Sequence, residues 1–321
     1  MDFALSADQL ELKQAARDWL ADRFPLDRDW ESTEDRWGEL AELGWLDVAE
    51  AGLGFVEEAL LLEELGYACY PGPYIATVGF ALPWLSAEQR ARVGAGEERW
   101  SVDVDGVPWL GSVDFVVSDG GTAYPSRGEE VASVDPSRPM GRLEKADGEP
   151  LAGDRNLPRA RTASAAEALG VAQRALDLGV EHAKTRLQFG KPIGTYQAVS
   201  HPLAQTYTDV ELARSLVYWA AWCVAEEEKA GSADGKAAGA RPADPTAFGG
   251  GRRAPVAAAA AAAFATEAAV AACERSIQVH GGIGFTWEHP LHRFYKRALW
   301  LEGFGSRPAE LRLEVANALL E

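Results

Sequence analysis

The segment RLQFGKPIGTYQ, residues 186–197, carries more chemistry than a connection between two helices requires. A bare turn needs only the glycine and the proline. Arg186 can donate two hydrogen bonds to a pair of phosphate oxygens, and Phe189 can lie against a flat ring. The side-chain amides of Gln188 and Gln197 can donate to phosphate or to the polar edge of a ring. These residue types suit a dinucleotide diphosphate that is bound without a GxGxxG loop.

A second segment, QVHGGIGF at residues 278–285, has the same character. Gly281 and Gly282 follow a long helical pattern and can let the backbone come close to a ligand. Gln278, with Val279 beside it, adds another amide donor. Each segment alone also has a simpler interpretation, as a Gly-Pro turn with a solvated arginine or as a glycine C-cap. Both interpretations stay open at this level.

Three parts of the chain, which differ in composition and in the spacing of their apolar residues, must position these segments. Residues 1–96 are predicted to be helical, with Ser6 as the N-cap of the first helix. Residues 97–158 contain short valine-rich runs broken by Gly, Pro and Asp, which predict a small β middle domain. Residues 159–321 predict a C-terminal four-helix bundle, and the Gly-, Ala- and Pro-rich stretch 229–254 predicts a flexible loop within it. The fold class is therefore mostly α with a small β middle domain.

Apolar stripes at helical spacing give the bundle prediction its detail. The members are Ala165, Ala168, Leu169, Ala172, Leu176 and Gly179 in the first stripe, and Leu203, Val210, Ala213, Val217, Ala220 and Val224 in the second. A third helix is expected over residues 256–279, and a short one at the end of the chain.

Charge and composition exclude several classes of partner. The formal net charge of −18 argues against nucleic acid or an anionic membrane surface. The sequence opens with no leader pattern and has no run of about 18 apolar residues, so we expect neither a signal peptide nor a membrane span. The three cysteines fit no disulfide framework, which favours a cytoplasmic protein. His280, His289 and His292 lack a further ligand at metal spacing, so no metal site is predicted.

Together, the two segments and the helices around them resemble the acyl-CoA dehydrogenase family. FALSADQLELKQAARDWL resembles the family's opening helix, EALGVAQRALDLGVEHAKTRLQFGKPIGTYQ the core of its C-terminal bundle, and SIQVHGGIGFTWEHPLHRFYKRA its flavin-contacting end. The resemblance implies a helical N-terminal domain, a β middle domain and a C-terminal four-helix bundle. It also implies FAD at a subunit interface, an acyl-CoA substrate and electron-transfer flavoprotein as the usual electron acceptor.

The resemblance assigns roles to the two segments residue by residue. Arg186, Gln188 and Phe189 would reach the diphosphate and adenine end of a flavin that a neighbouring subunit mainly holds. Residues of the second segment would contact the same flavin. The full set of cofactor-binding residues expected from the two segments is Arg186, Gln188, Phe189, Gln197, Gln278, Val279, Gly281 and Gly282.

The chain departs from the family where the catalytic base is expected. In most members that glutamate lies in a YEG(T/S) segment, and the corresponding stretch here is ALWLEGFGSRP. Placing Gly305 on the motif's glycine puts Phe304 at the base position, and a phenylalanine accepts no proton. A second location used in the family precedes an arginine that resembles Arg161, and there the chain has Ala160. The family's TEPGxGSD segment also has no counterpart, since WSVDVDGVPWLG takes its place.

Two carboxylates remain as weak candidates for a base. Glu302 lies two residues before Phe304, and its simpler interpretation is an exposed or salt-bridged side chain near Arg297. Glu167 lies in the first bundle helix, and with Ser164 it fits the capping box S-x-x-E at a helix start.

These features resemble the shorter, base-lacking subunit of heterotetrameric acyl-CoA dehydrogenases that act on steroid side chains in actinobacteria. That resemblance implies an α2β2 complex with a homologous subunit, which supplies the base and most of the acyl-CoA site. The substrate would be a bulky CoA thioester, such as a steroid side-chain derivative. Two alternatives stay open: a self-sufficient homomeric acyl-CoA dehydrogenase that uses Glu302 or Glu167, and a flavin-free scaffold subunit.

Overall fold

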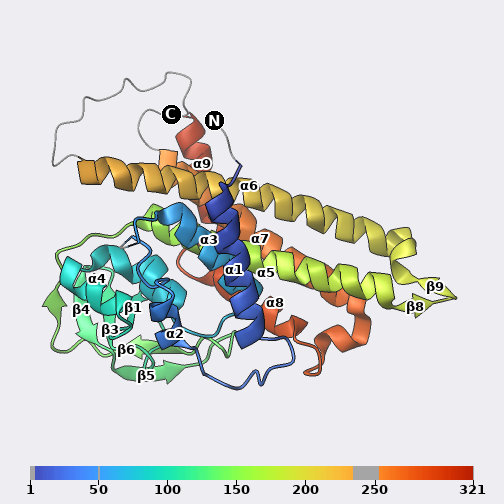
Figure 1. Cartoon of the computed structure of the whole chain (residues 1–321), viewed down its shortest axis with the longest axis horizontal. Helices are drawn as coiled ribbons and strands as arrows, with labels where there is room; N and C mark the ends of the chain where they lie inside the picture. The colour runs from blue at the N-terminus through green and yellow to red at the C-terminus, as the bar shows by residue number, and fades with distance from the viewer. Residues whose placement is uncertain (1–3, 50, 234–252, 321) are drawn as a thin grey trace.

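The computed structural model describes residues 4–49, 51–233 and 253–320, and Figure 1 shows their arrangement. The helical segments are α1 (Ala7–Arg23), α2 (Trp37–Glu42), α3 (Phe55–Tyr67), the π-helix η1 (Ile75–Ala81), η2 (Leu82–Trp84), α4 (Ala87–Gly94), α5 (Leu157–Thr185), η3 (Ile193–Thr195), α6 (Gln197–Ala233), α7 (Arg253–His280), η4 (Gly281–Phe285), α8 (Leu291–Gly303) and α9 (Pro308–Leu320). The strands are β1 (Trp100–Asp103), β2 (Val107–Pro108), β3 (Phe115–Ser118), β4 (Thr122–Pro125), β5 (Gly128–Val131), β6 (Met140–Leu143), β7 (Glu149–Pro150), β8 (Leu187–Gln188) and β9 (Lys191–Pro192). The predicted fold class, mostly helical with a small β part, is confirmed.

The first helix begins where the sequence predicts. The Ser6 hydroxyl accepts a hydrogen bond from the Gln9 backbone N–H at 3.2 Å, and the Gln9 side chain accepts one from the Ser6 N–H at 2.9 Å. This reciprocal pair satisfies two amides that the helix itself leaves unpaired. The predicted N-cap is therefore confirmed.

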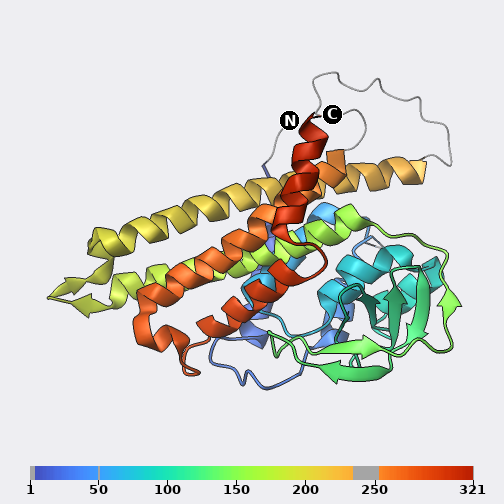
Figure 2. The same ribbon diagram turned by 180° about the vertical axis from the view of Figure 1, so that it is seen from behind.

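The long helices α5, α6 and α7 pack with α8 as a bundle whose core contains both predicted stripes (Figures 1 and 2). All twelve stripe residues are buried. One stretch among the described residues, Arg253–Phe285, is long and apolar enough to span a bilayer, yet 67% of its 18-residue apolar window is buried inside the protein. It runs against α5, α6, α8 and α9 and is the core helix of the bundle.

The predicted flexible loop at 229–254 is wrong at its two ends. Helix α6 continues to Ala233 and α7 begins at Arg253. Both are extensions of long helices, and Lys229, Ala230 and Ala254 are good helix formers. The rest of that prediction, residues 234–252, lies outside the described residues.

Helices α3 and α5 cross at very close range. A Cβ atom on Gly170 would overlap the carbonyl oxygen of Glu63, and one on Gly66 would overlap the carbonyl oxygen of Glu167. Two glycines therefore let the backbones of the N-terminal helices and the bundle meet directly. This crossing fixes the start of α5, which borders the pocket described below.

Strands β1 to β7 form two small sheets at one end of the bundle, apart from the pair β8-β9 (Figure 1). The four-stranded sheet has the order β1-β3-β4-β7, with β1 and β3 parallel, and the three-stranded sheet has the order β2-β6-β5. Residues Ser101, Val116 and Val117 in the paired strands β1 and β3 are almost fully buried. The ends of these two strands face the first turns of α5.

A buried ion cluster joins these sheets to the bundle. Arg297 on α8 has no exposed surface, and its guanidinium donates to Asp135 at 2.5 Å and to Glu167 at 2.7 Å. Glu167 also accepts from Arg138. The four side chains come from α5, α8 and the β5–β6 connection, so the cluster locks three parts of the chain together.

Two interpretations of the acidic residues are corrected by this geometry. Helix α5 begins at Leu157 with Asn156 as its N-cap, because Asn156 accepts from the Arg159 N–H at 3.1 Å and Pro158 suits a first turn. The capping box of Ser164 and Glu167 is therefore wrong, since both lie inside the helix. The suggested pairing of Glu302 with Arg297 is also wrong, because Arg297 is saturated by the buried cluster.

Candidate functional site

The Arg186–Gln197 segment forms a β-hairpin that extends beyond the end of the bundle (Figure 1). Strands β8 and β9 pair around a two-residue turn, Phe189 and Gly190, with φ angles of 50° and 80°. This left-handed turn matches the twist of a hairpin, but it suits Asn or Gly and not a bulky residue at its first position. The predicted connection is thus an ordered hairpin.

The Phe189 side chain contributes little to the packing of this chain. Its ring is 91% exposed, and its backbone occupies a conformation that costs a side-chain-bearing residue about 1 kcal/mol. Arg186, Gln188 and Gln197 are also exposed. Strained backbone and an exposed aromatic ring together indicate a residue that is kept for binding.

Replacing Phe189 with asparagine is expected to raise the stability of the chain by about 1 kcal/mol, because Asn-Gly is a favoured pair for this turn. The urea midpoint of the purified chain measures the change. Leu187→Asn is the matched control, since Leu187 is also exposed, at 60%, but lies in a strand with ordinary φ. A loss of stability in Phe189→Asn would contradict this account of the turn.

The second predicted segment lies at the same end of the bundle. Gly281 follows the last residue of α7 with φ of 65°, so the predicted helix end at the glycine pair is confirmed. Gln278, Gly281 and Gly282 are exposed and Val279 is half-buried. Because the rings of His182 and His280 stack with centroids 4.2 Å apart, the ends of α5 and α7 adjoin. We call the exposed surface of residues 186–197 and 278–287 the hairpin end.

The hairpin end combines a cation, amides, open glycine backbone and apolar surface. Arg186 and the two glycines supply donors for a diphosphate. Five large apolar side chains can pack against a flat ring or an apolar partner surface, and they are 46% to 91% exposed: Leu187, Phe189, Ile283, Phe285 and Trp287. Such a surface fits one end of a dinucleotide together with an apolar partner face.

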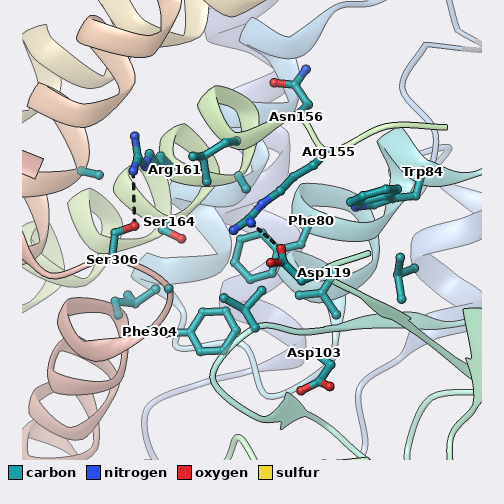
Figure 3. A pocket seen from close by; sticks show the side chains of 18 of the residues that line it. Phe80, Trp84, Asp103, Asp119, Arg155, Asn156, Arg161, Ser164, Phe304 and Ser306 are labelled. Atoms are coloured by element: carbon teal, nitrogen blue, oxygen red, sulfur yellow. Dashed lines mark hydrogen bonds and ion pairs between the residues drawn. The ribbon is translucent and has the colours of Figure 1, made fainter. Parts of the chain in front are cut away.

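A pocket lies at the opposite end of α5, between the four-stranded sheet and the bundle (Figure 3). Its volume is about 70 Å³, well below the several hundred Å³ of a site for a cofactor-sized ligand. Ser164 in the pocket and Arg186 in the hairpin are separated by about 33 Å along the helix, at 1.5 Å per residue. The residues that line the pocket are Phe80, Trp84, Val102, Asp103, Val104, Val117, Ser118, Asp119, Arg155, Asn156, Leu157, Ala160, Arg161, Ser164, Ala262, Thr266, Leu301, Phe304, Gly305, Ser306 and Leu311.

An aromatic column fills one wall of this pocket. Phe304 stacks on Phe80 with ring centroids 5.7 Å apart and on Trp300 with centroids 4.5 Å apart. Phe80 comes from the π-helix η1, a type of segment that is often found at functional sites. Figure 3 shows the Phe80 and Phe304 rings beside the pocket. The position aligned with the family's base is therefore occupied by the middle ring of an apolar stack.

The carboxylates of the pocket are held by cations. Asp119 pairs with Arg155, as drawn in Figure 3, and Asp103 pairs with Lys145 at 3.0 Å. Glu167 belongs to the buried ion cluster and Glu302 does not line the pocket. Burial and the nearby Glu267 and Glu274 carboxylates raise the pKa of Glu302, so it faces the acidic side of α7.

Arg161, the arginine beside Ala160, forms an ion pair with the last helix, α9. Arg161 donates to both carboxylate oxygens of Glu314 on α9, at 2.6 Å and 2.8 Å, and to the Ser306 hydroxyl at 3.4 Å. This bidentate pair closes the pocket on the side of α9.

Comparison with known proteins identifies the class of this fold and site. Residues 6–93 match the model of the acyl-CoA dehydrogenase N-terminal domain, and residues 147–306 match that of the acyl-CoA dehydrogenase C-terminal domain. The chain is 34% identical over 266 residues to acyl-CoA dehydrogenase IpdE2 of Mycobacterium tuberculosis, covering 78% of this chain and 74% of that protein. It is 30% identical over 313 residues to acyl-CoA dehydrogenase FadE34 of the same organism, covering 85% of this chain and 41% of FadE34.

Solved structures share the whole fold. A steroid acyl-CoA dehydrogenase variant, Tcur3481-Tcur3483, superposes with a TM-score of 0.82 at 25% identity and covers 98% of each chain. The ChsE4-ChsE5 complex of Mycobacterium tuberculosis gives a TM-score of 0.78 at 22% identity, covering 100% of this chain and 99% of that one, and this likeness concerns the fold alone.

The chain belongs to the acyl-CoA dehydrogenase family. Members are FAD-dependent flavoproteins and oxidoreductases that act on a CH–CH bond, so FAD is the cofactor to test against the residues present. The donors and the flat side chain of the hairpin end fit the diphosphate and adenine end of FAD. The pocket beside Phe304 does not fit the flavin ring, because its volume is too small and the aromatic column occupies its wall.

Several residues that line the pocket could not be predicted from the sequence. Asp119, Arg155 and Ser306 come from three different elements and belong to no motif. Their meeting depends on how the sheet, α5 and the α8–α9 connection pack. The one available signal was Arg161, which the family resemblance had already placed beside the site.

Proposed function

We propose that this chain is the non-catalytic subunit of a FAD-dependent acyl-CoA dehydrogenase complex. The chain offers its hairpin end to FAD bound across the interface with a homologous partner chain, and the partner removes the α-proton of the substrate. The eight expected residues, Arg186, Gln188, Phe189, Gln197, Gln278, Val279, Gly281 and Gly282, are the ones that bind the cofactor in this proposal. The division into parts 1–96, 97–158 and 159–321 belongs to the same proposal.

One observation carries the proposal. Phe189 is held almost fully exposed on a strained turn, and its one ring contact among the described residues is the edge of Tyr196, at 6.5 Å between ring centroids. Burial of an aromatic ring is worth several kcal/mol when a partner covers it. A surface of this kind is explained by a ligand and an interface outside the chain.

The pocket supports the second half of the proposal. Proton abstraction needs a carboxylate within hydrogen-bond reach of the substrate carbon. The described carboxylates that line the pocket, Asp103 and Asp119, are both paired with cations. With Phe304 in the aromatic column, this pocket offers no free base and little room for a thioester.

The relatives support the wider assignment. The superposed structures are a steroid acyl-CoA dehydrogenase and a complex of two differently named chains. By analogy, the complex here is an α2β2 heterotetramer that acts on a bulky, steroid side-chain CoA thioester in the cytoplasm. Electron-transfer flavoprotein accepts the electrons in this proposal.

The flavin content of purified complexes tests the proposal. Co-expression with a homologous acyl-CoA dehydrogenase that carries the base is expected to give a mixed complex with about one FAD per two chains, while this chain alone holds none. Absorbance of released FAD against protein concentration measures the ratio.

The two alternatives give different outcomes in that experiment. A yellow homomer that reduces a dye with an acyl-CoA would make Glu302 or Glu167 the base and end the proposal. A stable mixed complex without flavin would make the chain a scaffold, and would end it equally.

A further inference from the structure

Three histidines from three elements form a stack next to the hairpin end. His182 lies in α5, His280 is the last residue of α7, and His289 lies just before α8. The ring centroids of His182 and His280 are 4.2 Å apart, and those of His280 and His289 are 4.4 Å apart. We call these three residues the histidine stack. No group of three or more ligating side chains in the described part of the chain is arranged to hold a metal ion, so the stack is not a metal site.

Hydrogen bonds orient two of the rings, and the one at His289 selects the uncharged form of that ring. The His280 Nδ1–H donates to the carbonyl oxygen of Ser276 at 2.8 Å. The backbone N–H of Leu291 donates to His289 Nδ1 at 3.3 Å, which requires that this nitrogen carries no proton. His289 also stands at the N-terminus of α8, where the positive end of the helix dipole disfavours a cation.

The surrounding charges act in the same direction. Burial lowers the pKa of His182, and His280 and Arg186 add to that effect. Burial also lowers the pKa of His280, although its hydrogen bond to the Ser276 carbonyl opposes the shift. Burial, assisted by His280, His182 and His292, lowers the pKa of His289 to about 4.

The neighbour on α8 brings no compensating negative charge. Burial, with Lys296 and Arg293 beside it, lowers the pKa of His292 to about 4. Among the described residues, no carboxylate contributes to the pKa shifts of the three stacked rings. The charged groups that contribute to these shifts are therefore cationic or histidine side chains.

The stack closes the ends of the turn that carries the glycine pair. His280 precedes Gly281 and His289 follows the turn, so their contact joins the two ends of residues 281–288. His182 lies four residues before Arg186 and adds the hairpin to the same unit. The position of both binding segments thus depends on one set of stacked rings.

We infer that His182, His280 and His289 are positioning residues: the uncharged stack holds the turn and the hairpin in the arrangement that binds FAD, and a proton on His289 releases them. The part that concerns FAD rests on the proposed function. The part that concerns the turn rests on the stack alone.

The size and sign of the effect follow from linkage. The pKa of His289 is depressed from 6.5 to about 4, so its contribution is complete above pH 6.5 and is lost as the pH falls toward 4. Opening of the turn is therefore expected to be about tenfold more favourable at pH 5.5 than at pH 8.

Hydrogen exchange of the chain alone measures this opening. Amides of residues 281–291, including the Leu291 N–H that bonds to His289, are expected to lose about tenfold protection between pH 8 and pH 5.5, after correction for intrinsic exchange. His289→Asn keeps an acceptor near the Nδ1 position and cannot titrate, so its protection is expected to be the same at both pH values. His201→Asn, on the exposed side of α6, is the matched control and retains the tenfold loss.

Several results would overturn the inference. One is equal protection of the wild-type turn at both pH values, and another is a tenfold loss that persists in His289→Asn. Should that variant fail to fold, the NMR titration of His289 in the wild-type chain replaces it, and a midpoint near 6.5 counts against the stack. Because these measurements need neither partner nor FAD, they do not depend on the proposed function. If the mixed complex binds FAD at pH 8, equal affinity at pH 5.5 would remove the positioning role and leave the proposed function intact.

Discussion

Replacing Arg297 with methionine is expected to lower the free energy of unfolding by about 4 kcal/mol. The guanidinium is fully buried and donates to Asp135, Glu167, the Tyr70 carbonyl and the Ser137 hydroxyl. Methionine leaves two buried carboxylates with one cation, Arg138, between them. Urea denaturation of the wild-type and variant chains measures the difference.

Arg293→Met is the matched control for this prediction. Arg293 lies one turn earlier on α8 and pairs at 2.7 Å with Glu31, whose side chain is 74% exposed. The Arg293 side chain is itself only 12% exposed, but the Glu31 carboxylate stays in water, so this pair is worth less than about 1 kcal/mol. Equal losses in the two variants would refute the special role of the buried ion cluster.

The pH dependence of the Arg297→Met deficit provides a second test. Burial opposes ionisation of Asp135, but Arg297 and Arg138 outweigh it and hold the pKa of Asp135 below 3.8 in the wild-type chain. That contribution to stability is present above pH 3.8 and is lost as the pH falls through the lowered value. In the variant, the carboxyl takes up a proton more readily, so the deficit is expected to shrink as the pH falls from 7 to 4.

Replacing Arg186 with alanine is expected to weaken FAD binding by the mixed complex roughly 10- to 100-fold. A charged, bidentate hydrogen bond to phosphate is worth about 1.5–3 kcal/mol. The side chain is exposed in the chain alone, so the stability of the chain should change by less than about 0.5 kcal/mol. Titration of the flavin-depleted complex with FAD, followed by flavin fluorescence, measures the affinity.

Lys184→Ala is the control for Arg186→Ala. Lys184 is exposed near the end of α5, two residues before Arg186, and belongs to neither binding segment. If Arg186→Ala and Lys184→Ala leave the affinity for FAD equally unchanged, the hairpin is not a flavin contact.

The helical part of the fold was predictable because its signals are local. The stripe of Ala165 to Gly179 and the cap at Ser6 depend on neighbours within a few turns, and both are confirmed. The capping box at Ser164 was wrong for the same reason. Its pattern was correct, but the true helix start at Leu157 depends on Asn156 and Pro158, a competing signal just upstream.

The parts that could not be predicted depend on distant pairings. Arg297 and Asp135 lie 162 residues apart, and no local pattern links them. The same holds for the histidine stack, whose members come from three elements. The sequence did single out the two segments that lie together at the hairpin end, but not that the first is a hairpin with Phe189 in a left-handed conformation.

Under the proposed function, the exposed hairpin end has a consequence for how the cell must supply this protein. In a copy of the chain without its partner, the five large apolar side chains of the hairpin end are exposed to solvent. Chaperones and proteases recognise exposed apolar surface of this kind, and it promotes aggregation. Synthesis of the two chains in matched amounts would limit the lifetime of that copy. In the proposed complex, an excess of this chain over its partner should therefore be degraded or aggregate faster in the cell than the mixed complex.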